Sequence, residues 1–128
     1  MRRPLATLVL AAALTGGCGG DDAPGRTVTL PAAGELRVVA DEYSFDPEAV
    51  VYDAGGAGTR VRILLDNRGS LAHNLKVFDG DTELGGTPTF PGGRQEAGTV
   101  ELEPGQYRLV CTVGDHEELG MTGTLELR

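Results

Sequence analysis

Residues 109–121 read L-V-C-T-V-G-D-H-E-E-L-G-M. This segment places Cys111 at the end of an apolar run, His116 in the middle and Met121 at its close. The whole chain has only two Cys, two His and two Met. Half of these soft donors therefore fall within one short segment, which predicts a metal site.

The segment is flanked by two runs typical of strands. Residues 106–111 and 122–127 alternate apolar and polar positions, as half-buried strands do. In this alternation Cys111 falls on the inward face of the first run and Met121 on the inward face of the second. We therefore expect both residues at facing ends of neighbouring strands, joined by the loop that contains His116.

Similar short runs occupy most of the chain, at intervals of about ten residues, and no stretch has the period of a helix. The predicted strands cover residues 35–40, 49–52, 60–66, 73–78, 98–102, 106–111 and 122–127. The pattern predicts an all-β fold, a Greek-key β-sandwich with a single domain. Residues 79–93 carry Gly, Pro and Asp with little periodicity and are predicted to form a surface excursion.

A fourth donor comes from far away in the sequence. His73 follows a loop and shares its predicted strand face with Leu75 and Val77, which allows it to lie at the same end of the sandwich. Two imidazoles and a thiolate, with a weak thioether on the axis, form the donor set of blue-copper sites. Zinc more often takes four strong ligands.

These residues resemble those of the cupredoxin family over residues 36–127. The resemblance rests on four motifs: His73-Asn74, Cys111-x4-His116-x4-Met121, the G-M-T-G sequence at 120–123 and the E-Y-S-F-D-P sequence at 42–47. It implies a Greek-key sandwich holding one type 1 copper ion. It further implies His73, Cys111 and His116 as equatorial ligands, Met121 as the axial ligand, and Asn74 as the residue that ties the ligand loops together.

The first residues form a secretory signal pattern of the bacterial lipoprotein type. Two arginines precede an apolar stretch at 5–14, and Gly-Gly-Cys follows at 16–18. We expect a signal peptide at 1–17, lipidation of Cys18, a flexible tether at 18–26 and the copper-binding domain at 27–128. The protein is then exported and anchored by lipid to the cell membrane, facing the periplasm or the cell exterior.

Export has consequences for the second cysteine and for the charge. With Cys18 lipidated, Cys111 lacks a disulfide partner, and a metal is the expected holder of its thiol. Loss of the two arginines of the signal moves the formal charge from -8 to about -10. This charge argues against nucleic acid as a partner. We expect a monomer that meets a redox protein with a basic docking surface.

The function that follows is the transfer of single electrons between redox partners, without enzymatic activity. A copper carrier that delivers the ion is the alternative. A cysteine-dependent hydrolase, a thiol oxidoreductase and a β-sandwich binding module are rivals from other classes. The acidic residues Asp115, Glu117 and Glu118 surround His116, which we expect to be exposed, and fit either a docking role or a solvated loop. Tyr43 and Phe45 are expected in the core.

Overall fold

The computed structural model describes residues 26–32 and 34–128. These residues form strands, turns and bends without any helix, so the predicted all-β fold is confirmed. The strands are β1 (Thr27–Pro31), β2 (Leu36–Asp41), β3 (Ser44–Asp46), β4 (Ala49–Asp53), β5 (Thr59–Asn67), β6 (Lys76–Asp79), β7 (Thr82–Gly86), β8 (Arg94–Leu102), β9 (Gly105–Val110) and β10 (Thr122–Leu127).

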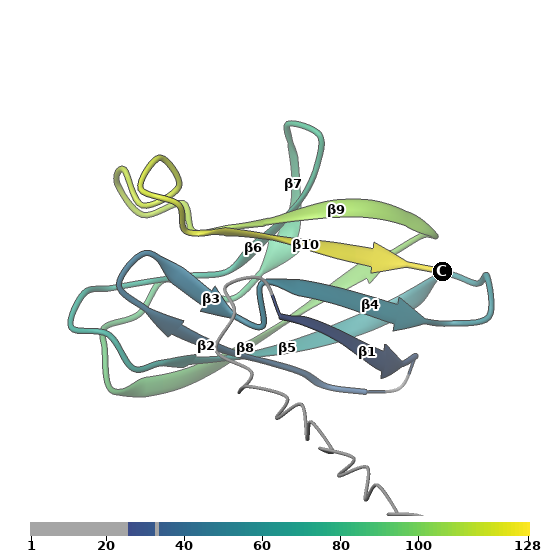
Figure 1. Cartoon of the computed structure of the whole chain (residues 1–128), viewed down its shortest axis with the longest axis horizontal. Helices are drawn as coiled ribbons and strands as arrows, with labels where there is room; N and C mark the ends of the chain where they lie inside the picture. Colours follow the sequence, from purple (N-terminus) through teal and green to yellow (C-terminus); the bar gives the residue numbers. More distant parts are fainter. Residues whose placement is uncertain (1–25, 33) are drawn as a thin grey trace, which may run out of the picture.

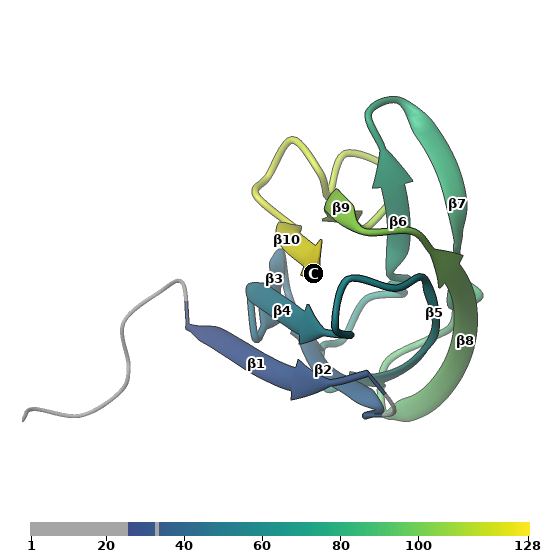
Figure 2. The same ribbon diagram turned by 90° about the vertical axis from the view of Figure 1, so that its right-hand side faces the viewer.

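The strands form two sheets that face each other (Figure 1 and Figure 2). The six-stranded sheet has the order β1-β4-β10-β9-β6-β7, and the four-stranded sheet has the order β3-β2-β5-β8. The chain passes repeatedly from one sheet to the other, which is the connectivity of a Greek-key sandwich. Strand β4 is parallel to both of its neighbours, β1 and β10.

The core lies between the sheets and follows from the period of two in the sequence. In β5, Val61, Ile63 and Leu65 are fully buried, while Arg60 and Arg62 on the opposite face are exposed. Burial of each such aliphatic side chain stabilises the fold by on the order of 1.5–3 kcal/mol. None of these three side chains is a candidate metal ligand, but Cys111 and Met121 belong to the same buried cluster, so the site borders the core.

Three strands were not predicted, and each has a weak sequence signal. Strands β1 and β3 lie at the edges of their sheets, and β1 has no buried residue. Strand β7 lies within the predicted surface excursion, for which no strand was predicted, and its residues are exposed or half-buried. Its sequence T-E-L-G-G has no apolar alternation, and it is a strand because it pairs with β6 in a hairpin.

The predicted strand at 73–78 begins later than expected, at Lys76. His73 instead forms an isolated bridge with Phe90, in which each backbone N–H donates to the other residue's carbonyl at 3.1 Å. His73 is thus fixed by backbone hydrogen bonds while lying outside the regular sheet. The bridge also places the segment before β8 beside the candidate site.

The backbones of β7 and β8 meet at two glycines where the sheets converge (Figure 2). A Cβ atom on Gly98 would collide with the carbonyl of Gly86, and one on Gly86 would collide with the carbonyl of Leu75. Leu75 in turn accepts a hydrogen bond from Thr87 N at 2.9 Å. The contact between β7 and β8 therefore leaves no room for a side chain at Gly86 or Gly98, and it lies beside the segment that carries His73.

One end of the sandwich gathers the β9–β10 loop, the β2–β3 turn and the β5–β6 connection (Figure 1). The C-terminus lies at the other end. The predicted signal segment 1–17, Cys18 and the tether up to residue 25 lie outside the described residues. Within the described part of the chain, no helix is long and apolar enough to cross a bilayer.

Candidate metal centre

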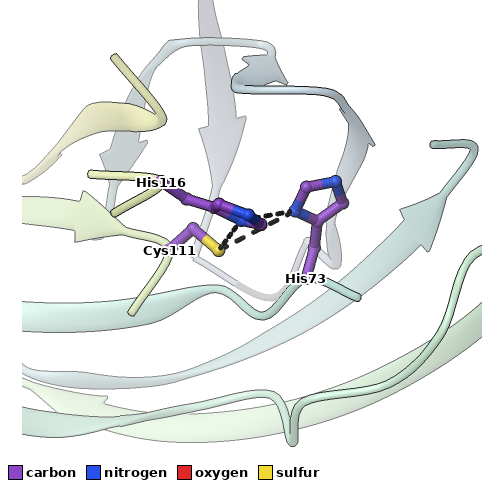
Figure 3. Close-up of side chains that lie close together, drawn as sticks. All are labelled: His73, Cys111 and His116. Atoms are coloured by element: carbon purple, nitrogen blue, oxygen red, sulfur yellow. Dashed lines mark hydrogen bonds between the residues drawn. The ribbon is translucent and has the colours of Figure 1, made fainter. Parts of the chain in front are cut away.

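Three of the four predicted ligands converge at this end of the sandwich (Figure 3). The Nδ1 atoms of His73 and His116 lie 3.2 Å apart. The Sγ atom of Cys111 lies 3.9 Å from Nδ1 of His73 and 3.5 Å from Nδ1 of His116. All three residues are buried. The site is thus a triangle of two imidazole nitrogens and one sulfur, enclosed by protein.

The size of this triangle suits a single metal ion. A point inside it lies about 2.1 Å from all three atoms, as follows from the side lengths, and metal–nitrogen and metal–sulfur bonds are about 2.0–2.3 Å long. The donor atoms are therefore spaced for one ion bound by all three, without a shift of the backbone.

Cys111 and His116 are positioned by the ends of β9 and β10. These strands are antiparallel neighbours, and the Cys111 N–H donates to the Met121 carbonyl at 3.1 Å just beyond their last ladder pair. The Met121 N–H in turn donates to the carbonyl of His116, a residue of the loop itself, at 3.0 Å. The loop that carries His116 is thereby closed at its base, where the sequence predicted the two strand ends to meet.

Met121 is fully buried directly before β10. Its two backbone hydrogen bonds connect it to both Cys111 and His116. These contacts place its backbone between the segments that carry Cys111 and His116. The assignment of its thioether as the axial ligand stays a prediction.

Asn74 connects the two segments that carry the ligands. Its Nδ2 group donates to Oγ1 of Thr112 at 2.8 Å, and its Oδ1 atom accepts the Thr112 N–H at 2.9 Å. Nδ2 also donates to Oγ1 of Thr89 at 2.8 Å. Because Asn74 follows His73 and Thr112 follows Cys111, these bonds fix the distance between two of the donors.

His116 is more enclosed than the sequence suggested, with only 7% of its surface exposed. The ring of Tyr43 packs edge-on against it, with 5.2 Å between centroids and 74° between planes. Tyr43 itself is 37% exposed, so the expectation that it belongs to the core was wrong, whereas Phe45 is buried as expected. Tyr43 has a φ of 63°, which a non-glycine residue rarely adopts. This backbone conformation occurs in the turn that covers His116.

The acidic residues around His116 differ in their surroundings. Asp115, Glu117 and Glu118 are all exposed on the β9–β10 loop. Glu117 forms an ion pair with Arg108 of β9, which neutralises it locally. Asp115 and Glu118 thus carry the unshielded negative charge that the sequence assigned to this loop.

Glu42 is a residue near the site whose role sequence reasoning missed. Its Oε1 atom lies 3.6 Å from Nε2 of His73. Burial lowers the pKa of His73, His116 lowers it further, and Glu42 raises it. The N–H of Leu71, which donates to the Glu42 carboxylate, is the main cause that lowers the pKa of Glu42. At neutral pH the site therefore pairs a neutral imidazole, able to bind a metal, with a charged carboxylate.

Several solved structures share this fold. A dithionite-reduced auracyanin from the photosynthetic bacterium Roseiflexus castenholzii has a TM-score of 0.63 at 17% identity, covering 76% of this chain and 98% of that one. Auracyanin B has a TM-score of 0.65 at 21% identity, covering 85% and 93%. An azurin, iso-2, from the obligate methylotroph Methylomonas sp. strain J has a TM-score of 0.59 at 18% identity, covering 76% and 99%.

No protein-family model and no curated protein matches the sequence. Auracyanin and azurin are cupredoxins, and the likeness extends over nearly the whole of each of these chains. The described residues have the same all-β architecture. The chain therefore has the cupredoxin fold.

Proposed function

We propose that this protein is a type 1 copper protein that carries single electrons between redox partners. The observation that carries the proposal is the buried triangle formed by Nδ1 of His73, Nδ1 of His116 and Sγ of Cys111. Two imidazoles and a thiolate in one plane favour copper, since zinc is usually held by four strong ligands. Bound copper would supply a one-electron couple between Cu(II) and Cu(I).

Burial of the donors favours an electron carrier over a protein that delivers copper. His73 and Cys111 have no exposed surface, and His116 is buried with its ring against that of Tyr43. An electron can pass through the ring of His116, whereas an ion can leave only after the covering side chains move. The same burial argues against a cysteine-dependent hydrolase or thiol oxidoreductase, because a nucleophilic thiolate must reach its substrate.

The proposed setting is the cell envelope. The basic, apolar and Gly-Gly-Cys segments before residue 19 support export and lipid attachment at Cys18. A redox partner with a basic surface is favoured by the exposed carboxylates of Asp115 and Glu118 beside His116, since opposite charges accelerate encounter. A monomer is sufficient for this role, because all of the proposed ligands belong to one chain.

The proposal is tested by adding Cu(II) to the metal-free protein and recording the visible spectrum. An intense thiolate-to-copper charge-transfer band with one copper per chain is expected. Cys111→Ser should abolish the band while circular dichroism shows an intact fold, because serine is close to cysteine in size and most of the core cluster consists of residues that are not candidate ligands. Wild-type protein that takes up no copper, or a Cys111→Ser variant that stays blue, would refute the assignment.

A second measurement separates electron transfer from copper delivery. The loaded protein is mixed with a one-electron reductant and, in parallel, with an excess of a strong Cu(I) chelator. An electron carrier is reduced rapidly and loses copper at least a hundredfold more slowly than it is reduced. Loss of copper at the rate of reduction would favour delivery.

A further inference from the structure

One ring atom of His73 is left without a partner in a buried position. His73 has no exposed surface, and its Nδ1 atom faces the other two donors. Its Nε2 atom has no hydrogen-bond partner among the residues that the structure describes. A metal at Nδ1 requires the ring proton to reside on Nε2, so this atom needs an acceptor.

A charged acceptor lies close by, the carboxylate of Glu42, whose Oε1 atom is 3.6 Å from Nε2. This distance exceeds that of a hydrogen bond, and a small rotation of the ring or the carboxylate closes it. The Glu42 side chain is 35% exposed and reaches the site from the turn between β2 and β3. It is thus a charged acceptor that belongs to a segment without any of the proposed metal ligands.

Glu42 is held in this place by the loop before His73. Its Oε1 atom accepts the N–H groups of Ser70 at 2.6 Å and Leu71 at 3.0 Å. A Cβ atom on Gly69 would collide with the Glu42 carboxylate and would lie 3.1 Å from Nε2 of His73. Glycine at position 69 therefore leaves the space through which the carboxylate approaches the imidazole.

We propose that Glu42 is a positioning residue that accepts the Nε2 proton of His73 and so fixes the ring with its Nδ1 lone pair toward the metal. The inference rests on the proposed copper site and adds a charged group to it. A carboxylate that accepts the proton of a metal-bound imidazole increases the basicity of that ligand. Its negative charge also favours Cu(II) over Cu(I), so Glu42 lowers the reduction potential.

Glu42→Gln tests this role because the amide oxygen can still accept the N–H groups of Ser70 and Leu71. The variant should bind Cu(II) about tenfold more weakly at unchanged Cu(I) affinity, which corresponds to a rise of about 59 mV in potential. Glu103→Gln is the matched control, since it removes the same charge from an exposed position in the turn between β8 and β9. Voltammetry should show no shift for the control.

A second readout does not depend on copper. Nitrogen-15 NMR of the metal-free wild type should show His73 protonated at Nε2, with a proton that exchanges slowly, and Glu42→Gln should change its shift and speed its exchange. Unchanged potential and ring signals in Glu42→Gln would reduce Glu42 to an anchor of the 69–71 loop and overturn the inference. A wild type with His73 protonated at Nδ1 would overturn it too, even if the variant fails to fold.

These outcomes separate the inference from the proposed function. If the wild type binds no copper, the proposed function fails, and the NMR measurement alone decides whether Glu42 orients His73. If copper binds with the expected band but the potential of Glu42→Gln equals that of the wild type, the function stands and the role of Glu42 fails.

Discussion

Asn74 and Thr112 are joined by two hydrogen bonds, and each residue directly follows a proposed metal ligand in the sequence. The bonds connect segments that are 38 residues apart. The pair therefore holds His73 and Cys111 at a fixed separation before any metal binds.

Asn74→Ala should weaken copper binding by about 10–100-fold, the usual effect of removing a group that orients a ligand. It should also lower the free energy of unfolding of the metal-free protein by about 1–3 kcal/mol, because the three part-buried hydrogen bonds of the Asn74 side chain are lost. Competition with a chelator and denaturant unfolding measure the two effects. Asn74→Asp, which keeps the acceptor for the Thr112 N–H, should lie between wild type and Asn74→Ala. Equal affinities for all three proteins would contradict a role for this pair.

Met121→Gln should retain copper and lower the reduction potential, because an amide oxygen stabilises Cu(II) where the thioether favours Cu(I). A tenfold change in the ratio of the two affinities corresponds to about 59 mV. Voltammetry on the loaded protein measures the shift. Met121→Leu, which removes the donor altogether, should move the potential in the opposite direction. A potential that is indifferent to both substitutions would show that Met121 is not axial.

Tyr43→Ala should expose the ring of His116. The lost edge-on contact is expected to cost about 0.5–1.5 kcal/mol beyond the buried area, and the opened site should release copper to a chelator faster. Tyr43→Phe keeps the ring and serves as the control. Identical release rates for the wild type and both variants would show that the cover does not limit access.

Neutralising Asp115 and Glu118 of the β9–β10 loop should alter the selectivity for charged redox reagents. The Asp115→Asn, Glu118→Gln double variant should react about tenfold more slowly with a cationic one-electron complex at low salt, with a flatter dependence on ionic strength. Reaction with an anionic complex should become faster. Stopped-flow kinetics over a salt series, with Glu103→Gln as the control, tests this. If the double variant reacts at the same rates as the wild type, the acidic loop is a solvated surface without a role in docking.

Cys18→Ala should release the protein from membranes, because the polar residues after it provide no apolar surface of their own. Fractionation with detergent phase partitioning follows the change. Retention of the variant in the membrane fraction would point to another anchor.

The strands with a strict alternation could be predicted from the sequence, and β10 was predicted to the residue. The same alternation predicted that Cys111 and Met121 would meet, because both continue the phase of neighbouring strands. The edge strand β1 was not predicted although T-V-T-L-P alternates, because the run is short and its apolar residues Val28 and Leu30 are only half-buried.

The surroundings of the site were less predictable. The cover of Tyr43 over His116 and the approach of Glu42 to His73 depend on the turn between β2 and β3, which joins the site only in three dimensions. The hydrophobic periodicity of a strand predicts which of its faces is buried, and it does not predict contacts between turns that are distant in the sequence. The motif at 42–47 was part of the resemblance, but Glu42 had no predicted role and Tyr43 was expected in the core.

The close approach of β7 and β8 at Gly86 and Gly98 helps to set the position of the segment that carries His73. Gly98 lets the backbone of Gly86 approach, and Gly86 in turn touches the carbonyl of Leu75, two residues beyond His73. Even a methyl group at either glycine would wedge the strands apart and push the segment that carries His73. The position of His73 thus depends on the absence of a side chain at Gly86 and Gly98, neither of which contributes a ligand to the site.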